Sequence, residues 1–195
     1  WQELTLLGQP NHAGTTPMAL RHDAGYAAAR VVTFLRQLTS EVGPPLVATV
    51  GSLRLQPDMV NVVAGVARMT VDVRHTDELA LEEATRRVAA FSQEVSGSEG
   101  VRLQVRSLAR FQPVAFDPAV VALVERTAQR LGHSTMRLPS GAGHDAQMLA
   151  RMCPAGMVFV PSVKGISHNP AEYTAPADLE AGTNVLLQVA LELAS

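Results

Sequence analysis

The chain has 195 residues, of which 47% are hydrophobic and 17% are charged, as is typical of a globular protein with a substantial core. Its formal net charge of −2, together with the absence of any Lys- or Arg-rich run, argues against a partner that is nucleic acid or an anionic membrane surface. Its apolar runs are all shorter than the roughly 20 residues that a membrane-spanning helix requires.

The first part of the chain alternates between strand and helix patterns. Two-residue alternation is clearest in the second half of residues 60–74, where Arg68 and Thr70 fall on one face and Met69 and Val71 on the other. Apolar residues three or four apart indicate amphipathic helices. The predicted elements are strands over residues 3–8, 46–55, 60–74 and 101–106 and helices over residues 21–39 and 77–95. This β-α-β-β-α-β order predicts a ferredoxin-like module, with two helices covering one face of an antiparallel four-stranded sheet.

The pattern changes from about residue 111, where helices alternate with one short apolar run. Asp117 and Pro118 predict a helix start, with Asp as the N-cap and Pro at the first helical position. We expect helices over residues 118–131, up to Met152 and over 176–194, and a buried strand over 156–160. Strand-turn-helix units are typical of the edge of an α/β sheet, where ligands bind. One or two strands are too few for such a sheet, and the first residue is Trp1 rather than Met, so we expect a piece of a longer protein.

Three polar turns each place a histidine among glycines and small residues: His12, His144 and His168. Histidine both binds metals and transfers protons near neutral pH, so such loops on a rigid scaffold indicate an active site. The alternatives are that each is an ordinary turn residue and that Asp145 caps the short helix after His144. One His does not make a zinc site, which needs three or four ligands. The other histidines are expected at the surface: His22, His75 and His133.

A series of short motifs follows a fixed order along nearly the whole chain. They lie at residues 8–18 with Arg21, 49–51, 61–65, 72–74, 140–146 and 167–172. In this order they resemble the amidase/hydantoinase/carbamoylase branch of the M20 metallopeptidase superfamily, which includes N-carbamoyl-L-amino-acid hydrolases, allantoate amidohydrolases and yeast-type β-ureidopropionases. Residues 143–146 read Gly-His-Asp-Ala where M20 peptidases typically have Gly-Thr-Asp-Ala, which favours the carbamoylase branch. Two departures, Ala64 for the usual Pro and Lys164 for a common Gly, remove no functional group.

The resemblance implies an α+β architecture with a ferredoxin-like βαββαβ lid/dimerisation domain over residues 3–112. Residues 113–195 would be the C-terminal portion of a split α/β catalytic domain. The implied activity is that of a metal-dependent amidohydrolase that cleaves a linear-amide C–N bond, other than a peptide bond, in N-carbamoyl amino acids or ureido acids. The alternatives are an M20 aminoacylase or peptidase, and a non-catalytic dimerisation or binding fragment. The complete enzyme would hold two divalent metal ions, zinc, manganese or similar, whereas the site in this chain is incomplete and the chain alone is expected to be inactive.

The resemblance also implies roles for the matching residues. His168 would be a metal ligand, and His144 would contact the substrate near the metals as a catalytic and substrate-binding residue. His12 and Asn61 would reach from the lid into the partner subunit's site and steady the developing oxyanion. Arg74 would bind the substrate carboxylate through its planar guanidinium.

The expected partners are a small carbamoyl or ureido acid substrate and a second copy of the chain, which would form a homodimer through the lid. Neither nucleic acid nor a membrane is expected as a partner. The single cysteine, Cys153, cannot form an internal disulfide, which fits a cytoplasmic protein. Its place after a helical run and before Pro154 predicts a buried structural thiol.

Overall fold

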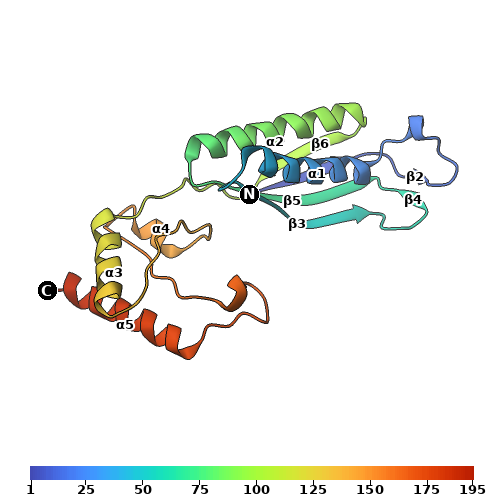
Figure 1. Cartoon of the computed structure of the whole chain (residues 1–195). Coiled ribbons are helices and arrows are strands. Elements are labelled where there is room, and N and C mark those ends of the chain that lie inside the picture. The colour runs from blue at the N-terminus through green and yellow to red at the C-terminus, as the bar shows by residue number, and fades with distance from the viewer. The chain divides into compact units, whose positions relative to one another are not determined.

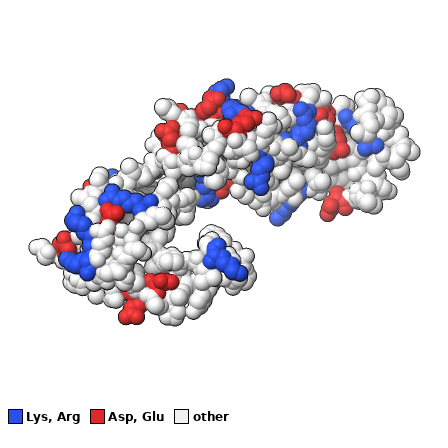
Figure 2. Space-filling view, in the orientation of Figure 1, with Lys and Arg blue, Asp and Glu red and all other residues white.

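The computed structural model describes all residues, Trp1–Ser195, and divides them into two compact units. The N-terminal unit comprises Trp1–Pro113 and the C-terminal unit comprises Val114–Ser195. Figure 1 shows the elements of each unit, and Figure 2 shows that acidic and basic side chains are interspersed over the visible face of each. None of the helices is both long enough and apolar enough to cross a membrane.

The N-terminal unit is a four-stranded antiparallel sheet with two long helices. Its elements are β1 (Gln2–Leu7), α1 (Ala24–Val42), β3 (Val47–Gln56), β5 (Val66–Arg74), α2 (Glu78–Ser98) and β6 (Arg102–Ser107). The strands lie in the order β3-β5-β1-β6, and every neighbouring pair is antiparallel. Both helices cover the same face of the sheet (Figure 1). The predicted mixed fold is therefore confirmed, and the long elements follow the predicted order.

The core of this unit lies between the sheet and its helices, as the alternating pattern predicts. Leu4 and Leu6 of β1 and Met69 of β5 are almost completely buried, and they pack with the apolar faces of α1 and α2. Helix α1 begins where the Asp23 side chain accepts hydrogen bonds from two backbone N–H groups, and α2 begins at Asp77 in a similar way. The caps and the buried face together fix where each helix begins and which side it turns to the sheet.

Several boundaries in this unit differ from the prediction, and helix α1, for example, spans Ala24–Val42 rather than residues 21–39. The expected strand over 60–74 is interrupted after β4 (Val62–Val63), and β4 pairs with the short strand β2 (Asn11–His12) instead of joining the main sheet. Helix α2 extends beyond its predicted end at residue 95, because it continues through Gly97 and ends at Ser98. Gly100, with a φ of 61°, then makes the turn toward β6.

The C-terminal unit consists of helices and irregular backbone. Its elements are α3 (Pro118–Arg130), α4 (Asp145–Leu149), the 3-10 turn η2 (Val163–Gly165), and α5 (Pro176–Leu193). Helices α3 and α5 pack through a small core of Leu123, Ala128, Val185 and Val189. Asp117 caps α3, as predicted, by accepting from the N–H groups of Ala119 and Val120.

Two predictions for this unit are wrong. Residues 156–160 do not form the expected strand, because a strand exists through hydrogen bonds to a neighbouring strand and residues 114–195 contain none. Cys153 is exposed rather than buried, since it lies in the turn that follows α4. In both cases an apolar local sequence was interpreted as core, whereas burial depends on what packs against it.

Candidate functional site

The pairing of β2 with β4 brings two of the predicted site residues together. The two strands form a short antiparallel ribbon, called the ribbon below. In it, Asn11 lies opposite Val63 and His12 lies opposite Val62. The N–H of Ala13 donates to the carbonyl oxygen of Asn61 at 2.9 Å, which places His12 and Asn61 at the same end of the N-terminal unit. Both residues are exposed, so the ribbon presents them to the outside of its own unit.

The turn that follows His12 is held by a set of hydrogen bonds. The backbone oxygen of His12 accepts from the N–H of Thr16 at 3.1 Å and from its hydroxyl at 2.7 Å, and Thr16 is buried. The guanidinium of Arg21 reaches back to the same turn, where Nε donates to the Thr16 oxygen at 3.1 Å and Nη2 to the Ala13 oxygen at 2.6 Å. Arg21 and Thr16 therefore fix the backbone that carries His12.

The hydrogen bonds of His12 also fix which ring nitrogen carries its proton. The backbone N–H of Gly14 donates to His12 Nδ1 at 3.0 Å. Because Nδ1 is the acceptor, the neutral ring carries its proton on Nε2. The exposed imidazole therefore offers an Nε2–H donor, which is the group needed to hydrogen-bond an oxygen that gains negative charge.

Arg74 ends β5 and belongs to a separate cluster. Its Nε donates to the two carboxylate oxygens of Asp72 at 2.9 and 3.1 Å, and its Nη2 donates to Oδ2 at 2.6 Å. The guanidinium carbon also lies 5.4 Å from the centre of the Trp1 ring. The hydrogen bond to Asp72 raises the pKa of Arg74 above its ordinary value, so the guanidinium is held charged and oriented.

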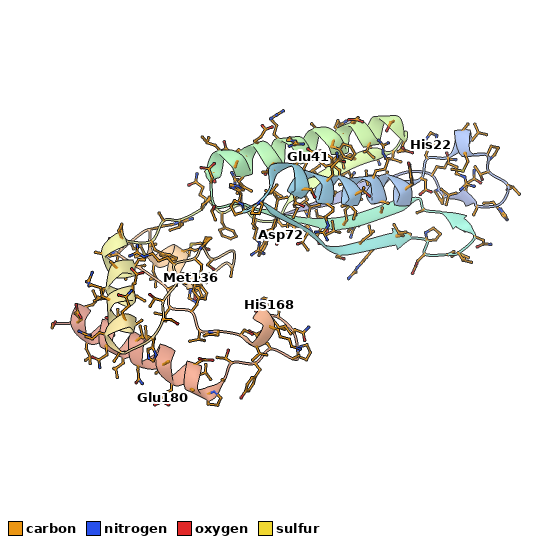
Figure 3. All side chains as sticks on the ribbon, in the orientation of Figure 1. His22, Glu41, Asp72, Met136, His168 and Glu180 are labelled. Carbon is orange, nitrogen blue, oxygen red and sulfur yellow. The ribbon has the colours of Figure 1, made fainter.

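The ribbon and the Arg74 cluster lie at opposite ends of the sheet. Strand β5 contains nine residues, begins at Val66 beside the ribbon, and ends at Arg74. At about 3.3 Å per residue, its two ends are roughly 26 Å apart. Figure 3 shows the same separation, with Asp72 and His22 toward opposite ends of the unit, His22 being bridged to Gln9 beside the ribbon. Within one copy, His12 and Asn61 therefore do not share a small-molecule site with Arg74.

His144 is the N-cap of α4, so the alternative in which Asp145 caps this helix is wrong. Its Nδ1 accepts from the N–H of Ala146 at 3.0 Å, and its own N–H donates to the Gln147 side chain at 3.4 Å. Asp145 is the first residue of the helix. As in His12, the neutral ring therefore carries its proton on Nε2, and the side chain is exposed.

His168 lies in the exposed loop after η2, as the proline that follows Asn169 predicts (Figure 3). Its φ of 56° lies in the left-handed region, which is unusual for a residue other than glycine. Its N–H donates to a carboxylate oxygen of Glu172 at 2.8 Å, and Asn169 Oδ1 accepts from the N–H of Ala171 at 2.9 Å. The loop is therefore held in a strained form by its own polar side chains.

The residues present do not by themselves fit a metal centre. No group of three or more His, Cys, Asp and Glu side chains is arranged to hold a metal ion. Of the predicted site residues, the structure brings together His12 and Asn61, and it places His144 and His168 in separate turns of the C-terminal unit. A stable zinc site needs three or four ligands, so His168 would require further donors.

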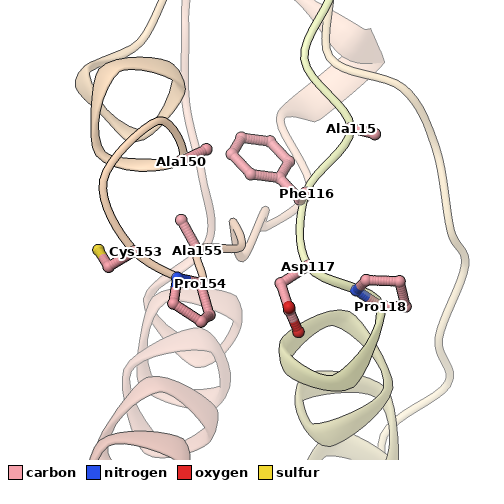
Figure 4. A pocket seen from close by; sticks show the side chains of 8 residues that line it. All are labelled: Ala115, Phe116, Asp117, Pro118, Ala150, Cys153, Pro154 and Ala155. Atoms are coloured by element: carbon pink, nitrogen blue, oxygen red, sulfur yellow. The ribbon is translucent and has the colours of Figure 1, made fainter.

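A pocket of about 350 Å³ lies elsewhere in the C-terminal unit (Figure 4). Its lining residues are Ala115, Phe116, Asp117, Pro118, Ala150, Cys153, Pro154 and Ala155. None of the predicted site residues is among them, and Asp117 is already engaged as the cap of α3. The pocket therefore adds nothing to the candidate site.

Sequence reasoning missed three residues that support the predicted ones. Arg21 and Asp72 lie within the motifs but were given no role, and Trp1 was noted only as an unusual first residue. A signal for Asp72 was available, because residues two apart on a strand share a face, so its carboxylate had to lie beside Arg74. The contact of Trp1 with Arg74 joins residues that are far apart in the sequence and had no local signal.

Comparison with known proteins gives consistent results. Residues 6–192 match the peptidase family M20/M25/M40. The chain is 38% identical over 194 residues to an N-carbamoyl-L-amino-acid amidohydrolase of Rhizobium meliloti, covering 100% of this chain and 47% of that protein. It is 37% identical over 191 residues to an allantoate amidohydrolase of Escherichia coli, covering 98% of this chain and 46% of that protein.

The chain is also similar to a solved structure. A hydantoinase/carbamoylase family amidase from Burkholderia vietnamiensis is 41% identical and superposes with a TM-score of 0.95, covering 98% of this chain and 46% of that one. The chain thus spans about half the length of the curated relatives that it matches.

Proposed function

The chain belongs to the peptidase family M20/M25/M40, and on that premise we propose that the protein containing it is a metal-dependent amidohydrolase. Its substrate would be an N-carbamoyl amino acid or a ureido acid, and it would cleave a linear-amide C–N bond. The observation that carries this proposal is the similarity along nearly the whole chain to two amidohydrolases of that substrate class. Gly-His-Asp-Ala at residues 143–146 supports it against an aminoacylase or peptidase.

The geometry of the ribbon supports a role for His12 and Asn61 at the reacting carbonyl. His12 offers an Nε2–H donor from a braced turn, and the Asn61 side chain carries an amide donor at the same end of the unit. Fixed donors aimed at an oxygen that gains negative charge stabilise the transition state without reorganisation. We assign these two residues to the oxyanion that forms when water attacks the ureido carbon.

The separation along β5 supports a site assembled from two copies of the chain. If Arg74 holds the carboxylate of a substrate, His12 and Asn61 of the same copy are too far away, because roughly 26 Å separates the two ends of the strand. We therefore propose a homodimer formed through the N-terminal unit, in which the partner subunit's His12 and the partner subunit's Asn61 complete the site.

The C-terminal unit would supply the remaining groups that this chain contributes. His144, with its proton on Nε2, would donate a hydrogen bond to the substrate, and His168 would be a metal ligand. We propose two divalent ions, zinc or manganese, in the complete enzyme, with the other ligands in the part of the relatives' length that this chain does not span. The absence of a disulfide partner for Cys153 supports a cytoplasmic location.

Activity and metal content test the proposal. Ammonia release from N-carbamoyl amino acids and from allantoate is measured for the complete protein and for the 195-residue chain. We expect turnover by the complete protein alone, and we expect stoichiometric metal in that protein alone. His168→Ala should abolish its activity and lower its metal content, whereas the control His133→Ala, at an exposed turn, should change neither. Turnover or stoichiometric metal in the 195-residue chain would show that the ligand set is wrong. An inactive but dimeric complete protein would favour the alternative, a dimerisation or binding module.

Mixed dimers test whether His12 acts across the interface. Subunits carrying His12→Ala are mixed with subunits carrying His168→Ala, each inactive alone. In a mixed dimer the site that keeps His168 receives an intact His12 from its partner, so one of its two sites is complete. Random pairing should then restore about a quarter of the wild-type activity. If His12 serves its own subunit, the mixture should remain inactive.

A further inference from the structure

Arg74 is held between an aromatic ring and a carboxylate, and neither of these partners has an assigned role. The Trp1 ring lies 5.4 Å from the guanidinium carbon, within the range of a cation–π interaction. The ring is half exposed, so it is not simply part of the core. Its other neighbour is Phe111, whose ring meets it edge-on with centroids 6.3 Å apart and an interplanar angle of 80°.

Hydrogen bonds hold the backbone of Trp1 in place. The Trp1 oxygen accepts from the N–H groups of Leu108 and Ala109 at 2.9 and 3.2 Å, and the Trp1 nitrogen donates to the Ala109 oxygen at 2.8 Å. These bonds extend the pairing of β1 with β6 by one residue. The backbone that carries the ring beside Arg74 is therefore held in place.

Asp72 sets the direction of the guanidinium. It stands two residues before Arg74 on the same face of β5, and both side chains are about one third exposed. Its carboxylate engages Nε and Nη2, which fixes the plane of the guanidinium through one edge. An arginine side chain otherwise loses rotamer entropy when a ligand orders it. An arginine that is already ordered avoids this cost when it binds an anion.

We propose that Trp1 and Asp72 are positioning residues that hold Arg74 ready for the carboxylate of the substrate. The three residues together would then determine the preference of the enzyme for substrates that carry a carboxylate. The inference rests on the proposed function, in which Arg74 binds that group. It adds that the affinity for the carboxylate depends on two residues that do not touch it.

The alternative role of Asp72 gives the opposite result. An acidic group beside Arg74 could instead compete with the carboxylate of the substrate, because two anions near one guanidinium repel each other. Removing a competitor strengthens substrate binding, whereas removing a positioning residue weakens it. The direction of the change in KM for Asp72→Asn therefore separates the two roles.

The experiment measures steady-state kinetics of the complete protein with an N-carbamoyl amino acid and with its uncharged carboxamide analogue. For the carboxylate substrate we expect Asp72→Asn and Trp1→Leu each to raise KM by about 5- to 30-fold, with kcat within about threefold of wild type. Trp1→Phe, which keeps an aromatic face, should retain most of the affinity. Neither Asp72→Asn nor Trp1→Leu should change kcat/KM for the carboxamide by more than about twofold. The matched control is Glu83→Gln, which breaks another acid–Arg pair, that of Glu83 with Arg86, on helix α2.

A double-mutant comparison shows whether the effect passes through Arg74. In an Arg74→Gln background, Asp72→Asn and Trp1→Leu should have no further effect on KM, because the group that they position is gone. An unchanged or lowered KM in Asp72→Asn, or equal losses with both substrates, would overturn the inference. If Arg74→Gln itself leaves KM unchanged, the assignment of Arg74 fails. If the wild-type protein hydrolyses neither substrate, the proposed function fails, so the three failures are distinguishable.

Discussion

Replacement of Gly65 by alanine should loosen the ribbon that carries His12. Gly65 is buried between β4 and β5, and a Cβ added there would lie 2.6 Å from Cδ, 3.0 Å from Cγ and 3.1 Å from Cβ of Pro10. Pro10 immediately precedes β2. Because the proline ring is rigid, the clash has to be relieved by moving the backbone of one segment away from the other.

The size of the effect follows from two opposing contributions. Overpacking of this kind costs about 1–3 kcal/mol of the free energy of unfolding. Replacing glycine by alanine at a compatible backbone angle returns about 0.4–1 kcal/mol by restricting the unfolded chain. The net loss should be about 1–2 kcal/mol. The matched control is Gly51→Ala, whose added Cβ would lie 3.6 Å from Thr70 Oγ1, an ordinary contact, so it should lose no stability.

Urea unfolding and amide hydrogen exchange of the 195-residue chain measure this prediction. The N–H of Gly8 donates to the Gly65 oxygen at 2.8 Å, and the N–H of Gly65 donates to the Gln56 oxygen at 2.9 Å. Both amides should exchange at least about fivefold faster in Gly65→Ala than in Gly51→Ala. Adding Pro10→Ala removes the two closest ring carbons and should recover part of the loss. Equal stability of the two glycine variants, or no recovery with Pro10→Ala, would refute the steric argument.

Three further predictions concern the same unit. Thr16→Val removes the hydroxyl that donates to the His12 oxygen and should cost about 1 kcal/mol in urea unfolding, since the site is buried. A lysine at position 21 cannot donate to the Thr16 and Ala13 oxygens at the same time, as the planar guanidinium does. In Arg21→Lys, hydrogen exchange at the Thr16 amide should therefore quicken by about threefold or more. The hydrogen bond from Arg87 lowers the pKa of Glu41, so this contribution to stability is present above the ordinary value of 4.5 and is lost as the pH falls through the lower folded value. In Arg87→Gln, an NMR titration should show the Glu41 pKa rising toward that ordinary value; an unchanged pKa would contradict the assigned cause.

The N-terminal unit was predictable because its signals are local. The alternation along β5 and the three- or four-residue spacing of apolar side chains along α1 and α2 are visible within a short window, and each predicts one element. The ribbon was not predictable in this way, because β2 and β4 have two residues each and show no periodicity. Its formation depends on contacts between segments far apart in the sequence, which a local pattern does not contain.

The C-terminal unit shows structural features that local sequence does not determine. The apolar run over 156–160 has the composition of a buried strand, yet it forms no strand because it has no partner strand. Local sequence can favour an extended, apolar segment, but the backbone hydrogen bonds of a β-sheet require a neighbouring strand. The same reasoning applies to His144, where either of two adjacent polar residues could cap α4 and only the folded turn determines that His144 does so.

The same backbone contact sets the neutral tautomer of both His12 and His144. In both His12 and His144, a backbone N–H two residues later donates to Nδ1, which leaves Nε2 to carry the proton of the neutral ring. At Gly14 the contact leaves little room for a side chain, because an added Cβ would lie 3.2 Å from His12 Cε1. Both exposed rings are therefore preset as hydrogen-bond donors, which suits the stabilisation of an oxygen that gains charge and does not suit a general base at Nε2. The backbone of these two turns thus selects the neutral tautomer of the histidine that each one carries.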